Sequence, residues 1–173
     1  METIKVKIKS NGSQPFYRRP GDAGVDLVAS MDVTIPPGHT VMIPTGMRLE
    51  IPEGVEAQIR PRSGMAWKTP LRVVNAPGTI DSSYRGEIMV LMQNTSERFY
   101  TDGAGVVKVM PDRPNNHYSC ESEGNQKGWY DIKRGDRIAQ MVFAPYLKAE
   151  FVQANSLSET ERGEGGFGST GVQ

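Results

Sequence analysis

The 173-residue sequence contains a single cysteine, Cys120, and no excess of charge of either sign. One cysteine excludes a disulfide within the chain and is typical of proteins in a reducing compartment. Twenty basic and twenty acidic residues give a formal net charge of zero. That balance argues against a protein that coats nucleic acid or binds membranes through a basic surface, although a few arginines in one site could still bind a small polyanion.

Long hydrophobic runs are also missing. Residues 1–9 alternate charged and apolar side chains, which predicts neither a signal peptide nor a membrane span. The length suits one domain and hardly two. We therefore expect a soluble, intracellular protein with one domain over residues 1–173.

Apolar residues alternate with polar ones in several short stretches. The pattern covers residues 4–9, 47–51 and 55–60, and each stretch predicts a half-exposed strand. Pro36-Pro37-Gly38 and Pro52-Glu53-Gly54 supply turns at the spacing expected of a β-sandwich or barrel. The predicted class is all-β.

Two stretches depart from this alternation. Ile88 to Met92 is continuously apolar, which predicts a strand buried on both faces, either against another subunit or in the core of a monomer. Thr101 to Gly128 is rich in Gly, Pro, Asn and charge, with one strand candidate, Val106 to Met110. Its length predicts an insertion or a functional loop.

The C-terminal residues 162–171 are too rich in glycine to fold alone, because glycine loses the most entropy on ordering. Arg162, the hydroxyls of Ser169 and Thr170 and the bare backbone N–H groups could bind phosphate oxygens, and Phe167 could stack on a base. We predict an arm that orders with ligand; a frayed terminus is the alternative. No Gly-Lys-Ser/Thr follows a strand here, which excludes a Walker-type phosphate loop.

Two earlier segments carry further candidates for anion binding. Pro61-Arg62-Ser63-Gly64 places a guanidinium, a hydroxyl and an open N–H at the start of the only predicted helix, Ser63 to Lys68. Ser63 is expected to cap this helix. The alternative to an anion site is that Ser63 only caps the helix and Arg62 is an ordinary surface arginine. Asp26 follows Val25 on an early strand. It is either a strand-end aspartate or a group that holds the waters of a metal ion.

Gly78 to Gly86 reads as a β-hairpin, because turn-forming residues lie between two glycines. Asp81 in this segment is either a turn residue or a base for a water that attacks phosphorus. Tyr84 could pack against a sugar or serve as an ordinary strand aromatic. The amide of Asn75 can both donate and accept, as the edge of a pyrimidine requires.

Taken together, five segments in order resemble the five conserved motifs of the trimeric deoxyuridine triphosphate nucleotidohydrolases (dUTPases). They are Ala23–Leu27, Pro61–Gly64, Asn75–Gly86, Gly135–Met141 and Arg162–Gly171. Single motifs are weak, but all five in sequence are very specific. The resemblance covers the chain apart from residues 101–128, a segment that most members lack. In having such a segment, the chain resembles the insertion-bearing dUTPases of bacteriophages. It implies a jelly-roll-like fold, a homotrimer with shared sites, and hydrolysis of dUTP to dUMP and pyrophosphate with Mg²⁺.

The resemblance also implies roles for single residues. Asp81 would activate the water that attacks the α-phosphate, and Tyr84 would lie under the deoxyribose. Uracil would be bound by Asn75 and the backbone around Gly78 and Ile80, with Phe167 closing over the base. The phosphates would be held by Arg62, Ser63, Gly64, Gln140, Arg162, Gly168, Ser169 and Thr170. Asp26 would hold water molecules on Mg²⁺, with no direct protein ligand to the metal.

The remaining expectations concern organisation and partners. Residues 156–173 would form a mobile arm, and residues 101–128 an insertion that either binds a regulatory protein or is a harmless loop. No nucleic acid or membrane partner is expected, and the location would be the cytoplasm of a bacterium or of a phage host. A dCTP deaminase is the related alternative. It is disfavoured because Gly64 stands where those enzymes carry a second serine.

Overall fold

The computed structural model describes residues 3–11, 14–96, 99–101, 107–109 and 128–166. The described residues form thirteen strands and one short helix, α1 (Ser63–Lys68). The strands are β1 (Lys7–Ser10), β2 (Gly24–Val28), β3 (Val33–Ile35), β4 (Thr40–Pro44), β5 (Met47–Glu50), β6 (Val55–Arg60), β7 (Leu71–Val73), β8 (Gly78–Ile80), β9 (Met89–Asn94), β10 (Phe99–Thr101), β11 (Val107–Val109), β12 (Tyr130–Ile132) and β13 (Arg137–Pro145). The predicted all-β class is confirmed. In this part of the chain no helix is long and apolar enough to cross a membrane.

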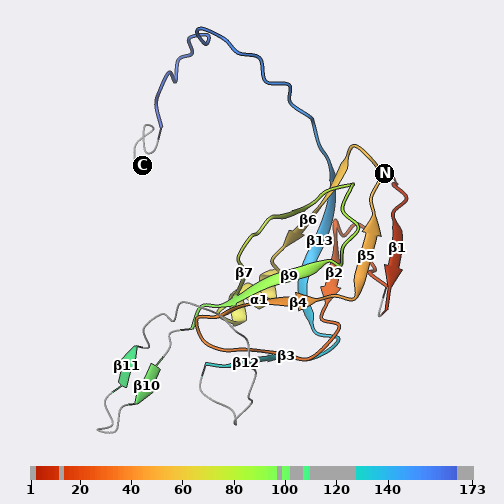
Figure 1. Cartoon of the computed structure of the whole chain (residues 1–173), viewed down its shortest axis with the longest axis vertical. Helices are drawn as coiled ribbons and strands as arrows, with labels where there is room; N and C mark the ends of the chain where they lie inside the picture. Colours follow the sequence, from red (N-terminus) through yellow and green to blue (C-terminus); the bar gives the residue numbers. More distant parts are fainter. Residues whose placement is uncertain (1–2, 12–13, 97–98, 102–106, 110–127, 167–173) are drawn as a thin grey trace.

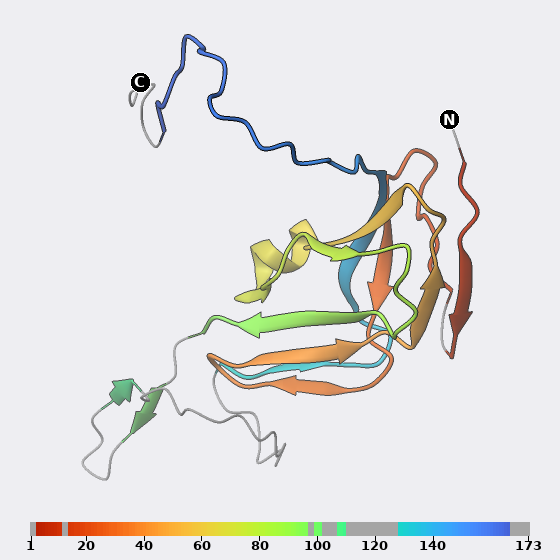
Figure 2. The same ribbon diagram turned by 45° about the horizontal axis from the view of Figure 1, so that its top comes forward.

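Two larger sheets form most of the body of the protein (Figures 1 and 2). One has the strand order β2-β13-β6-β8 and the other the order β4-β9-β7, and all their pairings are antiparallel. Strands that are neighbours in a sheet are mostly distant in sequence, as in a jelly roll. In particular, β13 lies between β2 and β6, which brings three of the five motif segments to one surface.

The alternation of side chains decides which residues face that surface. Val25 and Leu27 of β2 are buried in the core, so Asp26 points to the opposite face of the sheet. The same reasoning holds for the predicted strand at residues 55–60, where Ala57 and Ile59 are buried. The predicted turns are also confirmed, since Gly38 and Gly54 have φ angles of 67° and 82° that favour glycine.

The predicted hairpin at residues 78–86 is wrong. β8 pairs with β6, whereas β9 pairs with β4 and β7, so the segment between them crosses from one sheet to the other. A turn closed by the Tyr84 N–H, which donates to the Asp81 carbonyl at 3.1 Å, begins this crossing. The seven residues between β8 and Ile88 are too many for a tight two-residue hairpin, and each strand buries its apolar face in a different sheet.

One smaller prediction also fails, and a second is narrowed. Ser63 does not cap α1, because Arg62 occupies the N-cap position and makes no side-chain capping bond. For the strand at Ile88 to Met92, burial of both faces in the core of one protomer is wrong, and burial against another subunit stays a prediction. Val90 and Met92 are fully buried, but Met89 on the other face is 37% exposed. The predicted strand at Val106 to Met110 is observed as β11, while Cys120 lies outside the described residues.

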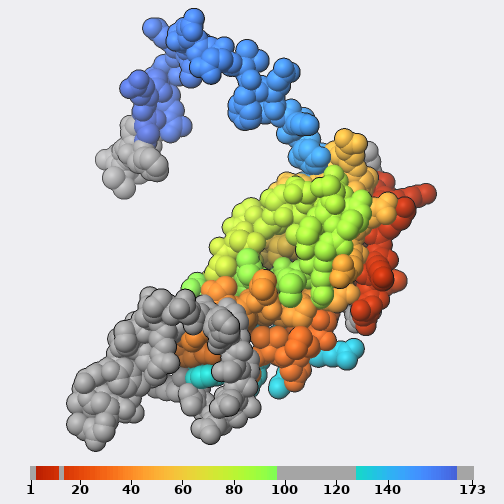
Figure 3. Space-filling model, in the orientation of Figure 1, coloured from red at the N-terminus to blue at the C-terminus, as the bar shows by residue number. Residues whose placement is uncertain are grey.

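The chain leaves the body after β13. Residues 146–164 are all exposed, and residues 146–166 contain neither strand nor helix (Figures 1 and 3). Every buried apolar residue of the described core lies between Val25 and Met141. The core is therefore complete without this C-terminal segment.

Candidate active site

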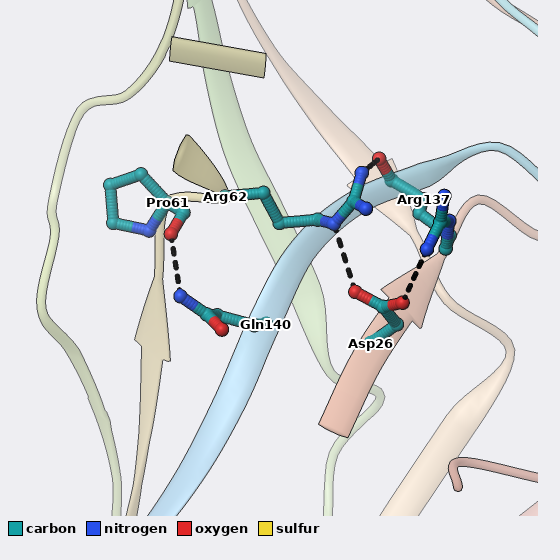
Figure 4. A network of polar contacts seen from close by, with 5 residues as sticks. All are labelled: Asp26, Pro61, Arg62, Arg137 and Gln140. Carbon is teal, nitrogen blue, oxygen red and sulfur yellow. Dashed lines mark hydrogen bonds and ion pairs between the residues drawn. The ribbon is translucent and has the colours of Figure 1, made fainter. Parts of the chain in front are cut away.

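Three charged side chains from separate motifs meet on the outer face of the four-stranded sheet (Figure 4). The Nε of Arg62 donates to Asp26 Oδ1 at 2.8 Å, and the Nη1 of Arg137 donates to Asp26 Oδ2 at 3.0 Å. The Nη1 of Arg62 also donates to the backbone carbonyl of Arg137 at 3.0 Å. We call Asp26, Arg62 and Arg137 the arginine cluster. The central position of β13 makes it possible, because β13 contacts both the Asp26 strand and the strand that leads to Arg62.

The arginine cluster carries a net positive charge, since two guanidinium groups share one carboxylate. The Asp26 side chain is only 15% exposed, and a carboxylate withdrawn from water in this way must be paired. Arg62 is held from its inner edge by Asp26 and by the Arg137 carbonyl. Within the described residues its Nη2 has no hydrogen-bond partner. The outer edge of a tethered guanidinium suits phosphate oxygens, which it can bind in a fork.

Gln140 extends this surface toward α1. Its Nε2 donates to the Pro61 carbonyl at 2.9 Å (Figure 4), and its backbone lies between Asp26 and Arg60 in the sheet. A Cβ at Gly24 would approach Gln140 Oε1 to 2.9 Å, so the Gln140 amide would have to shift to admit one. Ser63 and Gly64 are exposed in the first turn of α1, and a Cβ at Gly64 would meet no atom within 4 Å. The approach to this end of the helix is open.

A fixed turn precedes Arg137. The Arg134 N–H donates to Asp32 Oδ1 at 2.8 Å, and the Lys133 ammonium donates to Asp32 Oδ2 at 3.2 Å. The bond from the Arg134 N–H is the larger cause, and the bond from Lys133 the smaller, that holds the pKa of Asp32 below its usual value. Asp32 in turn raises the pKa of Lys133. Asp136 Oδ2 accepts from the Lys133 N–H at 2.8 Å. Asp32 and Asp136 thus both bind the turn that leads into β13.

The third motif forms a second group of candidate residues, around β8. The Asn75 amide lies against Gly78, where an added Cβ would approach Asn75 Nδ2 to 2.9 Å. Gly78 is buried and Ile80 half-buried, and β8 is an edge strand of its sheet, paired only with β6 among the described strands. Asp81 follows β8 directly with its carboxylate exposed. The structure therefore places Asn75 against Gly78, and Ile80 and Asp81 follow Gly78 along the chain.

Tyr84 is held beside this group by its own turn. Its hydroxyl donates to the Glu87 carbonyl at 3.1 Å, and its side chain remains 46% exposed. The ring lies directly over Gly86, and any Cβ at that position would collide with it. Sequence reasoning missed Gly86, Gly24 and Arg137. Their presence inside motifs was the only signal, because their partners are distant in sequence or visible only in three dimensions.

The two groups do not meet within one protomer. Asp81 follows Ile80, which is opposite Ala57 of β6, whereas Arg62 lies five residues beyond Ala57. At about 3.3 Å per residue, Asp81 and Arg62 are separated by roughly 15–20 Å along the strand direction. The group around β8 and the arginine cluster are therefore separate places on one protomer.

The candidate residues of the C-terminal motif are described only in part. Arg162 is exposed and its Nε donates to the Gly165 carbonyl at 2.8 Å, within a turn that includes Gly163. Phe167, Gly168, Ser169 and Thr170 lie outside the described residues. The predicted roles of this motif therefore stay predictions.

The all-β protomer thus carries two arginines paired with one aspartate and an amide beside a strand edge, and comparisons with known proteins identify its family. Residues 10–104 and 125–171 match the dUTPase family model. The deoxyuridine 5′-triphosphate nucleotidohydrolase of Hydrogenobaculum sp. is 41% identical over 174 residues, with both chains fully covered. The chain belongs to the dUTPase family, and the predicted dUTP diphosphatase is confirmed.

Solved structures of bacteriophage dUTPases are similar as well. The Staphylococcus bacteriophage 80alpha dUTPase with dUpNHpp is 30% identical, with a TM-score of 0.78, over 98% of this chain and all of that one. It is described among phage dUTPases that control the transfer of virulence genes. A single-residue mutant of the dUTPase from phage phi11 of S. aureus is 25% identical, with a TM-score of 0.69, over 88% of this chain and 98% of that one. It is described with a structural Mg(II) ion.

Proposed function

We propose that the chain hydrolyses dUTP to dUMP and pyrophosphate by attack of water on the α-phosphate. The observation that carries the proposal is the arginine cluster, in which Asp26 and the Arg137 carbonyl tether the guanidinium of Arg62. Hydrolysis of dUTP would keep uracil out of DNA and supply dUMP for thymidylate synthesis. A soluble enzyme of the cytoplasm, in a bacterium or a phage host, fits this role.

We assign the phosphates to the residues around the arginine cluster. Arg62, Ser63, Gly64 and Gln140 would bind them from the body of the protein, and Arg162, Gly168, Ser169 and Thr170 from the arm. Hydrolysis of a phosphoanhydride asks a protein mainly for positioning and charge neutralisation, which these groups offer. Closure of residues 156–173, with Phe167 over the base, would exclude water from a site that is complete only with a full triphosphate.

We assign uracil and the attacking water to the group around β8. The Asn75 amide and the backbone of Gly78 and Ile80 would read the base, and Asp81 would deprotonate the water. Cytosine reverses a donor and an acceptor at adjacent atoms, so buried groups would be left unpaired and dCTP would be rejected by roughly 10⁴-fold. Tyr84, held over Gly86, would exclude a 2′-hydroxyl by crowding.

We propose that a magnesium ion arrives with the nucleotide, as the family resemblance implies. In the described part of the chain no three His, Cys, Asp or Glu residues are grouped as a metal site. Both oxygens of Asp26 already accept an arginine N–H, which leaves only their remaining lone pairs for metal-bound water. Bound through the phosphate oxygens, Mg²⁺ would neutralise part of their charge.

We propose a homotrimer with sites shared between subunits, as the family resemblance predicts. The separation of Asp81 from Arg62 supports sharing, because sites shared between copies would bring the two groups to one nucleotide from different subunits. The outer face of the sheet β4-β9-β7 exposes Met42 to 61%, with Met89 and Val74 nearby. Leu147 and Phe151 of the C-terminal segment are 99% and 95% exposed. Apolar side chains exposed in this way suit contacts with a second copy.

Replacing Gly86 by alanine tests the position of Tyr84. The new methyl group would collide with the ring, so Tyr84 must swing away from its bond with the Glu87 carbonyl. We expect the KM for dUTP to rise roughly 10-fold and the preference for dUTP over UTP to fall, measured by steady-state kinetics. Ser83→Ala in the same turn is the control. Unchanged selectivity in Gly86→Ala would remove Tyr84 from sugar discrimination.

We further propose that residues 101–128 are an insertion that binds a regulatory protein. Likeness to phage dUTPases described as controlling gene transfer supports this second role. The fully buried Asn94 fixes the flanks of the segment: its Nδ2 donates to the carbonyls of Gly128 and Ile35 at 2.7 and 3.0 Å, and its Oδ1 accepts from the Ser96 N–H at 3.0 Å.

Because Asn94 fixes both flanks, deletion of residues 101–127 with retention of Gly128 should leave the catalytic body in place. We expect kcat and KM for dUTP to stay within about 2-fold of the full-length values, as for a change distant from the site. Pyrophosphate release measures both constants. A collapse of turnover would show that the segment serves catalysis instead of a partner.

The overall proposal is tested by a panel of dUTP, dCTP, dTTP and UTP with Mg²⁺ or with chelator. We expect pyrophosphate from dUTP alone, and only with Mg²⁺. Ammonia released from dCTP would identify a deaminase instead. An absence of any cleavage or binding of dUTP with Mg²⁺ present would refute the proposal.

A further inference from the structure

Arg137 has no assigned role, yet it contacts Arg62 by two routes. Its carbonyl accepts directly from Arg62 Nη1 at 3.0 Å, and its guanidinium binds Asp26 Oδ2, whose other oxygen binds Arg62 Nε (Figure 4). The Arg137 side chain is itself 37% exposed, beside a pocket of about 250 Å³ that Phe16 and Met47 also line.

An irregularity in β13 allows these contacts. The register of β13 against β2 shifts between Arg137 and Ala139, so Ile138 is an extra residue in the strand. Ile138 and Ala139 are both fully buried, while Arg137 and Gln140 are only half-buried and lie on the Asp26 side of the sheet (Figure 4). A regular strand would place residues three apart on opposite faces. The bulge therefore turns both Arg137 and Gln140 toward the site.

Removal of the Arg137 side chain would loosen Arg62. The terminal torsion of an aspartate is broad, so a carboxylate bound at one oxygen can rotate, whereas a carboxylate bound at both oxygens cannot. Arg62 has a long side chain with many rotamers, and its Nε depends on the orientation of that carboxylate. Asp26 with one arginine would hold Arg62 less firmly than Asp26 with two.

We infer that Arg137 is a positioning residue, which holds the guanidinium of Arg62 in its phosphate-binding orientation through the Asp26 carboxylate. The inference rests on the proposed role of Arg62 toward the triphosphate. It predicts that a loss at Arg137 affects binding of the phosphates and spares binding of the nucleoside.

The test compares Arg137→Gln, Arg137→Lys, Arg62→Gln and the double variant Arg62→Gln/Arg137→Gln in the full chain. Arg134→Gln is the matched control, because Arg134 is exposed in the adjacent turn and, among the residues that the structure describes, bonds only through its backbone N–H. The readouts are kcat and KM for dUTP and the inhibition constants of inorganic tripolyphosphate and of deoxyuridine. Thermal unfolding monitors the fold.

We expect Arg137→Gln to raise the KM for dUTP and to weaken tripolyphosphate inhibition, both on the order of 10-fold, because the phosphate-binding group is misplaced. Deoxyuridine inhibition should stay within about 2-fold, and in the Arg62→Gln background Arg137→Gln should add nothing. The KM and the tripolyphosphate inhibition of Arg137→Lys should lie between those of the unchanged protein and those of Arg137→Gln, since an ammonium can still bind one Asp26 oxygen. If Arg137→Gln does not fold, the same comparisons are made with Arg137→Lys in its place.

The contradicting results are distinct. An equal effect of Arg137→Gln with and without Arg62 would show that Arg137 acts independently of Arg62 and would overturn the inference. A normal KM in Arg137→Gln beside a raised KM in Arg62→Gln would also overturn it and leave the proposed function intact. A normal KM and normal tripolyphosphate inhibition in Arg62→Gln would reject the phosphate role of Arg62, and the inference with it.

Discussion

Asp81→Asn is expected to abolish turnover of dUTP while the nucleotide still binds. Asp81 is exposed directly after β8, next to the strand whose backbone we assign to uracil. Asparagine has nearly the same shape but cannot take a proton from water. Loss of a general base typically costs about 10²–10⁴ in rate, so kcat should fall by that factor while the dissociation constant of dUpNHpp changes little.

The matched control is Glu53→Gln, which neutralises an exposed carboxylate at the turn between β5 and β6. Among the described residues the Glu53 side chain makes no hydrogen bond, so this variant should keep normal turnover. Pyrophosphate release measures kcat, and calorimetry measures binding. If Asp81→Asn turns over dUTP at the normal rate, Asp81 is not the base.

Truncation before Arg162 is expected to give a folded trimer that barely hydrolyses dUTP. No residue of the described core lies beyond Met141, so removal of residues 162–173 takes nothing from the core. It removes Arg162, Phe167, Ser169 and Thr170, which we assign to the phosphates and the base. Loss of several donors to the phosphates should lower kcat/KM by at least about 10²-fold.

Light scattering and thermal unfolding separate loss of activity from loss of assembly in this experiment. The control ends at Gly171 and removes only Val172 and Gln173, beyond the fifth motif. Three subunits with low activity would match the proposed arm. Full activity of the long truncation would contradict it, and an active monomer would rule out sites shared between subunits.

Most strands could be predicted from the sequence, because a half-buried strand must alternate apolar and polar residues. Residues 47–51 and 55–60 show that alternation and form β5 and β6. The hairpin at residues 78–86 was predicted wrongly. Local turn residues show that a chain reverses, but the partner of each strand depends on which distant strand buries its apolar face. β8 and β9 consequently belong to different sheets.

The candidate site was predictable as a set of residues and not as an arrangement. The motifs named Asp26, Arg62 and Gln140, but their contacts depend on the register of β13 between β2 and β6. The bulge that turns Arg137 toward Asp26 has no local sequence signature. The separation of Asp81 from Arg62 likewise required the pairing of β8 with β6.

Hydrolysis of dUTP in water labelled with oxygen-18 tests the central claim most directly, because the label reports which phosphorus the water attacks. If the residues gathered here position a water against the α-phosphorus, all the label should appear in the phosphate of dUMP and none in pyrophosphate. Label in pyrophosphate, or release of a labelled single phosphate, would contradict the account.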